Sequence, residues 1–249
     1  MRTLIFVTCD GYWRRMRPTM QSIARASLHG TGHEAHVYVA TTDGEDVPAW
    51  AVEWEHSNTK LNVVHCYNER RHAKPSLLAH AFEYGLVDVE EEPDAIIIAD
   101  ADIIYPPDLF TTCAASIGGA SMTCASGERV HVTLECAEQI CISDMLPEED
   151  RLAHIISEYE DPAHTVRNGF FMGWLQAFTP DMIGCLPFSE YACHDGYDEF
   201  DYECAKRLMA TSTRCERLVW ERRPPIHLGH GHWGANWRGV SRGSTSCIF

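Results

Sequence analysis

The chain has 249 residues, of which 45% are hydrophobic, so it is long enough to bury one large core. Its formal net charge of -16 at pH 7 argues against a general affinity for nucleic acid, because binding to a phosphate backbone depends on clustered Lys and Arg. No segment approaches the roughly 18 apolar residues that a transmembrane helix requires. We therefore expect a single cytoplasmic domain over residues 1–249, with no transmembrane segment.

Apolar runs and turn residues predict alternating strands and helices over the first hundred residues. The predicted strands cover residues 3–8, 33–42, 61–67 and 95–99, and the predicted helices cover residues 18–28 and 75–87. Pro18 suits the first position of its helix. This βαβ order predicts an α/β fold with a mostly parallel central sheet and helices on both faces.

The second half of the chain gives weaker signals until about residue 168. A turn at Gly118-Gly119 and a hairpin or edge pair precede an exposed helix. The predicted elements are strands over 120–124 and 129–137, a helix over 147–161, a strand over 168–178, a helix over 198–210, a strand over 215–220 and a closing loop over 224–237. Gly169 and Gly173 would let a ligand or another backbone approach strand 168–178 closely.

Eleven cysteines are scattered along the chain, and no two of them form a Cys-x-x-Cys pair. Several lie within apolar runs. This distribution is typical of buried thiols in a reducing compartment, and it does not indicate a disulfide framework or a zinc ribbon.

The segment "IIIADADIIYPPDLF" joins an apolar strand directly to two carboxylates, Asp100 and Asp102. Open α/β sheets bind their ligands at the carboxyl ends of the strands, which is where these two residues are expected to lie. Two carboxylates with one residue between them can serve a divalent cation, one directly and the other through a water molecule or a sugar hydroxyl. Short acidic pairs are also common in exposed loops, and without a ligand we expect these two to be solvated in a cleft.

Basic residues are grouped at three places in this acidic chain. The groups are Arg14, Arg15 and Arg17; Arg70, Arg71 and Lys74; and Arg222 and Arg223. If the groups converge in the fold, they form a small anion site. Otherwise each is a solvated loop.

Three segments, in order along the chain, resemble the nucleotide-sugar-dependent glycosyltransferases of the GT-A fold, of the family 2-like or galactosyltransferase-like kind. The first is the Asp-x-Asp segment. The second, "NGFFMGWLQAFTPDMIGCLPFSEYACHDGYDEFDYECAKRL", is similar to their acceptor-side strand, a Phe-x-Glu turn and an acidic helix start. The third, "PIHLGHGHW", is similar to a C-terminal loop that returns a histidine to the metal. The resemblance covers most of the chain except residues 111–165.

This resemblance implies a single GT-A (Rossmann-like) domain that transfers a sugar from a nucleotide-sugar donor, with UDP-sugars favoured. Residues 1–110 would form the nucleotide-binding half, and residues 111–249 the acceptor-side half. A metal and basic side chains would lower the barrier by stabilising the charge that develops on the leaving diphosphate.

The resemblance also implies a metal site for Mn²⁺ or Mg²⁺. Asp102 would bind the metal directly, and Asp100 would contact the metal, a metal-bound water, the ribose or the sugar. His230 matches the histidine of the family's "HLGH" pattern, and a neutral imidazole beside carboxylate oxygens suits Mn²⁺. His227 and His232 lie in the same loop and leave the choice of histidine open.

Thr8, Asp10 and Asp43 match the positions at which such enzymes hold the base and the ribose, at the ends of the first two strands. Asp10 and Asp43 are equally plausible as turn formers or helix caps. The other residues that the resemblance assigns to the nucleotide sugar are Lys74, Asp100, Ala101, Gly169 and Gly173, and Arg14 or Arg15 would cover the diphosphate.

An inverting transfer requires a base that takes the proton of the acceptor hydroxyl. Asp201 matches the position of that base, and Asp198 is a rival because Phe200 stands where relatives usually carry Glu. These acids would also favour the start of a helix without any catalytic role.

Two other functions remain open from the sequence. A nucleotidyltransferase also combines an α/β sheet with a carboxylate-bound metal, although "CDGYWRRMR" lacks the glycines of a phosphate-binding loop. A non-catalytic module that binds nucleotide or metal is the other alternative. For a transferase, the acceptor could be a glycan, a lipid-linked sugar, a protein side chain or a small molecule.

Overall fold

The computed structural model describes most of the chain. The described residues are 1–29, 32–67, 69, 73–118, 122–125, 128–162, 165, 175–191, 197–220 and 224–228. Among these residues, no helix combines the length and the hydrophobicity needed to cross a bilayer.

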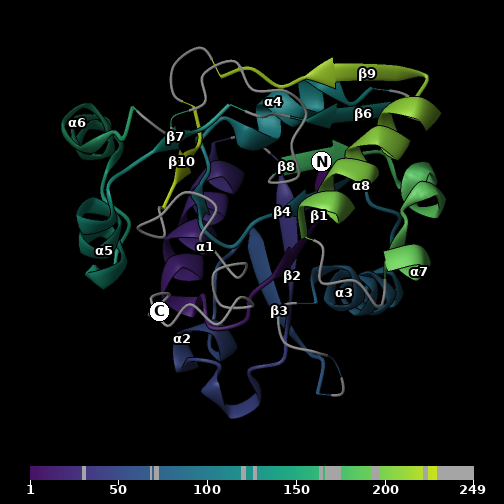
Figure 1. Ribbon diagram of the computed structural model, residues 1–249, viewed down its shortest axis with the longest axis horizontal. Coiled ribbons are helices and arrows are strands. Elements are labelled where there is room, and N and C mark those ends of the chain that lie inside the picture. The colour runs from purple at the N-terminus through teal and green to yellow at the C-terminus, as the bar shows by residue number, and fades with distance from the viewer. Residues whose placement is uncertain are drawn as a thin grey trace.

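Seven strands of the described part form one twisted sheet in the order β3-β2-β1-β4-β8-β6-β9 (Figure 1). The strands are β1 (Arg2–Thr8), β2 (Glu34–Thr41), β3 (Thr59–His65), β4 (Ala95–Ala99), β6 (Met122–Ala125), β8 (Leu175–Phe178) and β9 (Arg214–Arg217). The four neighbouring strands β3, β2, β1 and β4 are parallel to one another. Strand β8 is antiparallel to β4 and β6, and β6 is parallel to β9. The predicted mostly parallel sheet is confirmed.

Helices cover both faces of this sheet, as predicted, because alternate side chains of β1 and β4 enter separate cores. Ile5 and Ile97 pack in the core under α1 (Trp13–Leu28), α2 (Ala49–Val52) and α4 (Leu109–Ser116). Phe6 and Ile98 pack in the core under α3 (Lys74–Asp88), the 3-10 helix η2 (Pro180–Cys185) and α8 (Tyr197–Thr211), with α7 (Phe188–Tyr191) at its edge. Strands buried on both faces read as continuous apolar runs, which explains their clear sequence signal.

A smaller sheet lies beside the main one and is covered by two helices. Within the described residues it consists of β5 (Ile103–Ile104), β10 (Ile226–His227) and β7 (Val130–His131), in that order. Its core contains Ile104 and Ile226 together with apolar residues of α5 (Leu134–Ile142) and α6 (Glu149–Tyr159), which lie at the left of Figure 1.

Helix α3 lies close to the main sheet because residue 85 has no side chain. A Cβ atom at Gly85 would lie 2.8 Å from the ring of Phe6 and 3.0 Å from the ring of Tyr38. Both rings are fully buried, so they have little room to move. Gly85 therefore sets the distance from the sheet of the helix that begins at Lys74.

The prediction for the start of the first helix is wrong. Helix α1 begins at Trp13, so Pro18 lies inside it and deprives the carbonyl of Arg14 of its helical hydrogen bond. The extra turn buries Trp13 and Met16 in the core, and the N–H of Met16 donates to the Tyr12 carbonyl at 2.9 Å. Burial of these two large side chains outweighs the lost bond.

The two strands predicted as a hairpin or edge pair between residues 111 and 165 do not pair with each other. Strand β6 joins the main sheet, and β7 pairs with β10 in the small one. The predicted strand over 129–137 ends at His131, because Thr133 caps α5 by accepting a hydrogen bond from the N–H of Cys136 at 3.3 Å. The exposed helix predicted over 147–161 corresponds to α6.

Several strand boundaries differ from the sequence prediction by a few residues, and β3 and β9 are examples. Strand β3 begins at Thr59, because its pairing follows β2 from Ala35 onwards. Strand β9 ends at Arg217, and Leu218 and Trp220 are buried beyond it without belonging to a strand.

Buried thiols are confirmed for most of the cysteines that the structure describes. Cys9, Cys66, Cys113, Cys136, Cys141 and Cys204 are free and buried, Cys185 is half-buried and Cys215 is exposed. Burial raises the pKa of the Cys66, Cys136 and Cys141 thiols to about 11. These thiols are accordingly poor nucleophiles at neutral pH.

Candidate functional site

The carboxyl ends of β1, β2 and β4 bring the predicted donor residues to one edge of the sheet. Val7 pairs with Ala99, and Thr8 pairs with Ala40, so the residues that follow these three strands lie at the same edge of the sheet. Thr8 ends β1, and Asp100 directly follows β4. The convergence expected from a parallel sheet is therefore present.

Asp10 and Asp43 hold the turns at this edge. Oδ1 of Asp10 accepts hydrogen bonds from the backbone N–H of Thr42 at 2.7 Å and from the hydroxyl of Thr41 at 3.2 Å. Oδ2 of Asp43 accepts from the backbone N–H of Gly11 at 2.6 Å and from Nε1 of Trp13 at 2.8 Å. Gly11 has a φ of 76°, which glycine adopts without strain. Both carboxylates thus have the turn-forming role that the sequence allowed.

Lys74 joins two acidic segments that are far apart in the sequence. Its Nζ donates to Oδ1 of Asp100 at 2.8 Å and to Oδ2 of Asp201 at 2.9 Å. The side chain of Lys74 is 0% exposed, whereas those of Asp100 and Asp201 are 24% and 15% exposed. The sequence predicted all three residues as site residues but did not predict their contact.

Helix α8 places Asp201 at this point because the helix is anchored in the core. Phe200, Cys204 and Leu208 lie on its buried side and pack beneath the sheet. The side chain of Gln176, in β8, donates to the backbone carbonyl of Asp201 at 3.0 Å. Position 200 is therefore a packing position, which gives a physical reason for Phe where relatives of the resembled family carry Glu.

Asp102 faces the small sheet rather than α8. Its Oδ2 lies 3.3 Å from Nε2 of His227, and its backbone carbonyl accepts from the N–H of Leu228 at 2.9 Å. The antiparallel pairing of β5 with β10 places His227 opposite Ile103 and so fixes this approach. The ring of His131, in β7, lies 4.5 Å from that of His227 between centroids.

The two carboxylates are less solvated than we predicted for a site without ligands. The side chain of Asp102 is 10% exposed, and Asp100 is partly covered by its contact with Lys74. The cost of burying carboxylates next to an apolar strand is offset by these cationic and imidazole partners.

Tyr105 is a residue of this site that sequence analysis did not identify. It is buried, and burial together with the negative charges of Asp100 and Asp102 raises the pKa of its phenol. The phenol is therefore neutral at physiological pH. The "IIYPP" segment did not mark Tyr105 as a site residue, because a tyrosine after a strand is usually a core residue.

The first basic group forms ion pairs with Glu138 of α5 and with Asp144, which follows α5. Arg14 lies 2.8 Å and Arg15 lies 3.2 Å from the carboxylate of Glu138, and Arg17 lies 2.6 Å from Asp144. Arg14, predicted at the donor, therefore forms an ion pair in this structure. Arg70, Arg71, Arg222 and Arg223 lie outside the described residues.

Gly169, Gly173, His230 and His232 lie outside the described residues. Asp198 belongs to α8, but its side chain is not described.

The donor set around Asp102 suits a hard or intermediate divalent cation. A carboxylate and an imidazole converge there, and such O and N ligands suit Mn²⁺. In the part of the chain that the structure describes, no three His, Cys, Asp or Glu side chains gather closely enough to form a metal site by themselves.

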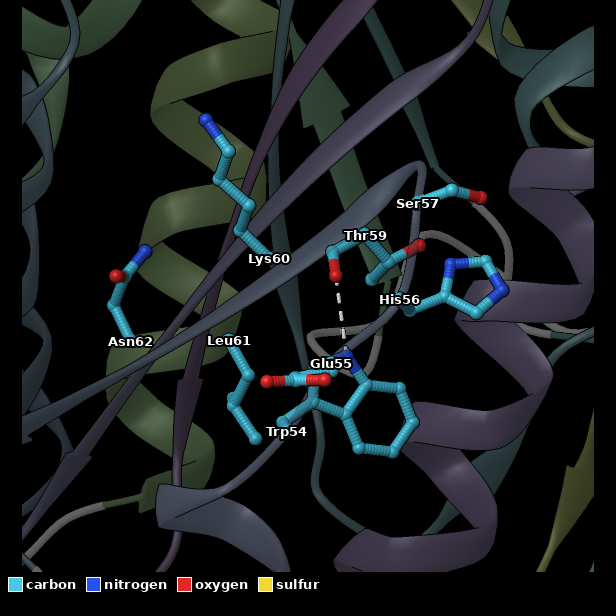
Figure 2. A pocket seen from close by; sticks show the side chains of 8 residues that line it. All are labelled: Trp54, Glu55, His56, Ser57, Thr59, Lys60, Leu61 and Asn62. Atoms are coloured by element: carbon cyan, nitrogen blue, oxygen red, sulfur yellow. Dashed lines mark hydrogen bonds between the residues drawn. The ribbon is translucent and has the colours of Figure 1, made fainter.

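A pocket of about 600 Å³ lies elsewhere, at the amino end of β3. Figure 2 shows the side chains that line it: Trp54, Glu55, His56, Ser57, Thr59, Lys60, Leu61 and Asn62. Since Thr59 begins β3, this pocket lies at the opposite end of the strand from the carboxyl edge and contains none of the predicted residues.

Comparison with solved structures identifies the fold. Residues 1–349 of S. aureus TarS match with a TM-score of 0.55 and 11% identity over 91% of this chain and 60% of that chain, both alone and in complex with UDP. Mannosyltransferase PcManGT from Pyrobaculum calidifontis, in complex with GDP-Man and Mn²⁺, matches with a TM-score of 0.49 and 15% identity over 88% of this chain and 57% of that chain.

The chain spans less than two thirds of the length of these solved chains. No protein-family model matches the sequence, and no curated protein matches it. The likeness to TarS confirms the predicted architecture at the level of the fold: the chain has the GT-A fold of nucleotide-sugar glycosyltransferases.

Proposed function

We propose that the protein is a metal-dependent glycosyltransferase that moves a sugar from a UDP-sugar to a hydroxyl group of an acceptor, with inversion at the anomeric carbon. One observation carries the proposal. The Asp-x-Asp segment and the predicted base Asp201 meet at Lys74, although 127 residues separate Lys74 from Asp201. Carboxylates on both sides of a strand-end site are the groups that such a transfer requires.

The donor is proposed to lie along the carboxyl ends of β1, β2 and β4. Thr8, Asp10 and Asp43 hold the base and ribose there, either directly or through the turns that they fix. The other proposed donor contacts are Asp100, Ala101, Gly169, Gly173 and Arg14. Crystallisation of TarS with UDP supports a uridine nucleotide as the first candidate.

A divalent cation, Mn²⁺ or Mg²⁺, is proposed to bind at Asp102, with a histidine of the segment that contains His227 and His230 and with Asp100 nearby. When bound, such a cation neutralises charge on the leaving diphosphate. The contact between Asp102 and His227 supports this choice, because it holds two suitable ligands at one place.

Asp201 is proposed to act as the base. Its carboxylate takes the proton of the acceptor hydroxyl while the hydroxyl oxygen bonds to the anomeric carbon. The bond from that carbon to the diphosphate breaks on the opposite face, and the nucleoside diphosphate leaves with the electron pair. Asp198, one helical turn earlier, is the alternative base.

Calorimetry tests the donor site. UDP and GDP are titrated with and without Mn²⁺ into wild type, Asp102→Ala and Asp144→Ala. Asp144→Ala is the control, because the side chain of Asp144 is 84% exposed. We expect Mn²⁺-dependent binding of UDP that Asp102→Ala abolishes and Asp144→Ala retains.

Binding of UDP that ignores the metal and the Asp102→Ala change would contradict the proposal. Binding of UDP without its release from any UDP-sugar would instead indicate the non-catalytic module.

A further inference from the structure

The ammonium of Lys74 is completely enclosed. Its side chain is 0% exposed at the start of α3, beneath the carboxyl edge of the sheet. An isolated charge is costly to bury, so the ammonium requires anionic partners. Asp100 and Asp201 supply them, one from the Asp-x-Asp segment and one from α8.

This burial determines which groups can meet a substrate. A lysine that binds a diphosphate must present its ammonium to the ligand. Here the two carboxylates retain exposed surface, 24% for Asp100 and 15% for Asp201, while the ammonium has none. A substrate at this edge therefore contacts the carboxylates, and Lys74 lies behind them.

The backbone of Asp201 is held independently of Lys74. Phe200 and Cys204 anchor α8 in the core, and Gln176 donates to the Asp201 carbonyl. This anchoring does not fix the rotation of the Asp201 carboxylate about its side-chain bonds. The hydrogen bond from Nζ to Oδ2 restricts that rotation, and the bond to Asp100 fixes the ammonium itself.

We propose that Lys74 is a positioning residue that orients the base Asp201 relative to the Asp-x-Asp segment, rather than a ligand of the donor diphosphate. This inference rests on the proposed function. Proton transfer depends on geometry, and a base that rotates freely spends less time aimed at the acceptor hydroxyl. Lys74 therefore acts on the transfer step and not on donor affinity.

The test separates kcat from donor affinity in the full chain. Lys74→Met keeps an unbranched side chain one atom shorter than that of Lys and removes its charge. We expect kcat to fall about 100-fold, within the range that general bases contribute. We expect the affinity for UDP with Mn²⁺ to stay within about threefold, a difference below 1 kcal/mol. A diphosphate ligand would show the opposite pattern, with weakened UDP binding.

A double-mutant cycle shows whether Lys74 acts through Asp201. Asp201→Asn alone is expected to lower kcat about 1,000-fold. If Lys74 only orients this base, the kcat of Lys74→Met/Asp201→Asn is no lower than that of Asp201→Asn alone. The effects of residues that act as one unit are not additive. Independent, multiplied effects of about 100,000-fold would overturn the inference.

Two more variants guard against a trivial loss of folding. Lys74→Arg keeps the charge and is expected to give a kcat between those of wild type and Lys74→Met, with unchanged UDP affinity. Lys206→Met removes an α8 lysine whose side chain is 62% exposed and is expected to leave both quantities unchanged. Should Lys74→Met fail to fold, weakened UDP binding in Lys74→Arg would overturn the inference, and lowered kcat alone would support it.

The assay follows UDP release from UDP-glucose, UDP-galactose and UDP-N-acetylglucosamine, with water as the acceptor, and then uses the fastest substrate. No release by wild type from any of them means that the proposed function fails, and the inference fails with it. Release by wild type together with impaired UDP binding in Lys74→Met means that the inference alone fails.

Discussion

Asp100 and Asp102 are two residues apart, yet they belong to different regions of the molecule. Asp100 faces the buried ammonium of Lys74 and, through it, Asp201 of α8. Asp102 faces His227 in the small sheet. An Asp-x-Asp segment at a strand end can therefore serve two separate environments, because its two carboxylates contact different elements of the fold.

The two regions are also held by different means. On the Asp100 side, the packing of α3 and α8 against the core brings Lys74 and Asp201 close to Asp100, and hydrogen bonds from the ammonium join the three side chains. On the Asp102 side, backbone pairing of β5 with β10 does the positioning, and the N–H of Leu228 donates to the Asp102 carbonyl. Loss of one side chain should therefore disturb stability on the first side and ligand binding on the second.

The largest expected effect is on stability, at Lys74. Lys74→Met leaves Asp100 and Asp201 without their shared cation, and breaking a buried ion pair from one side costs about 3–5 kcal/mol in the free energy of unfolding. Asp201→Asn added to Lys74→Met should recover part of that loss, because it removes one of the two like charges. Urea unfolding at pH 7 measures both changes.

Lys206→Met provides the control for this measurement and should change the free energy of unfolding by less than about 0.5 kcal/mol. A loss below about 1 kcal/mol in Lys74→Met would show that the two carboxylates do not depend on the ammonium, and the contrast between the two sides would disappear.

The next largest effect is expected on ligand binding at Asp102. His227→Ala should weaken Mn²⁺-dependent UDP binding by about 10- to 100-fold while leaving the unfolding free energy nearly unchanged, because the small sheet is paired through its backbone. His154→Ala, which alters an exposed residue of α6, is the matched control. Unchanged UDP affinity in His227→Ala would remove this histidine from the proposed metal site and leave His230.

The smallest effect concerns the start of α3, which carries Lys74. Glu69 accepts hydrogen bonds from Ser76 and His80 of α3, and these bonds lower the pKa of the Glu69 carboxyl. A carboxyl with a lowered folded-state pKa stabilises the protein above its usual pKa near 4.5, and this stabilisation is lost as the pH falls through the folded-state value.

Glu69→Gln should therefore cost less than about 1 kcal/mol at pH 7, and nothing in acid below the folded-state pKa. Unfolding measured across this pH range checks the difference. A cost that does not change with pH would mean that the charge of Glu69 is irrelevant to the start of α3.

Local pattern predicted the parallel half of the fold. The strands β1, β2 and β4 are buried on both faces, so their apolar runs were unambiguous. The strands from residue 111 onwards are short and pair with partners distant in sequence, such as β7 with β10. Periodicity carries no information about such partners, so the strands predicted as a hairpin or edge pair were not assigned to their true partners.

The site shows the same limit. The sequence identified Lys74, Asp100 and Asp201 as site residues, but their shared contact depends on the depth at which α3 and α8 pack. That depth follows from Gly85 against Phe6 and from Phe200 in the core, which a sequence pattern does not reveal. The contact of Asp102 with His227 depends likewise on a two-residue strand inside a predicted loop.

The separation of 127 residues between Lys74 and Asp201 has a consequence for synthesis. A chain that emerges from the ribosome N-terminus first has completed β1 to β4 long before α8 exists. At that stage the ammonium has Asp100 as a partner, but the second carboxylate has not yet been made. An unfinished chain thus holds the proposed donor-side residues without the proposed base, and the proposed catalyst is completed only when α8 docks.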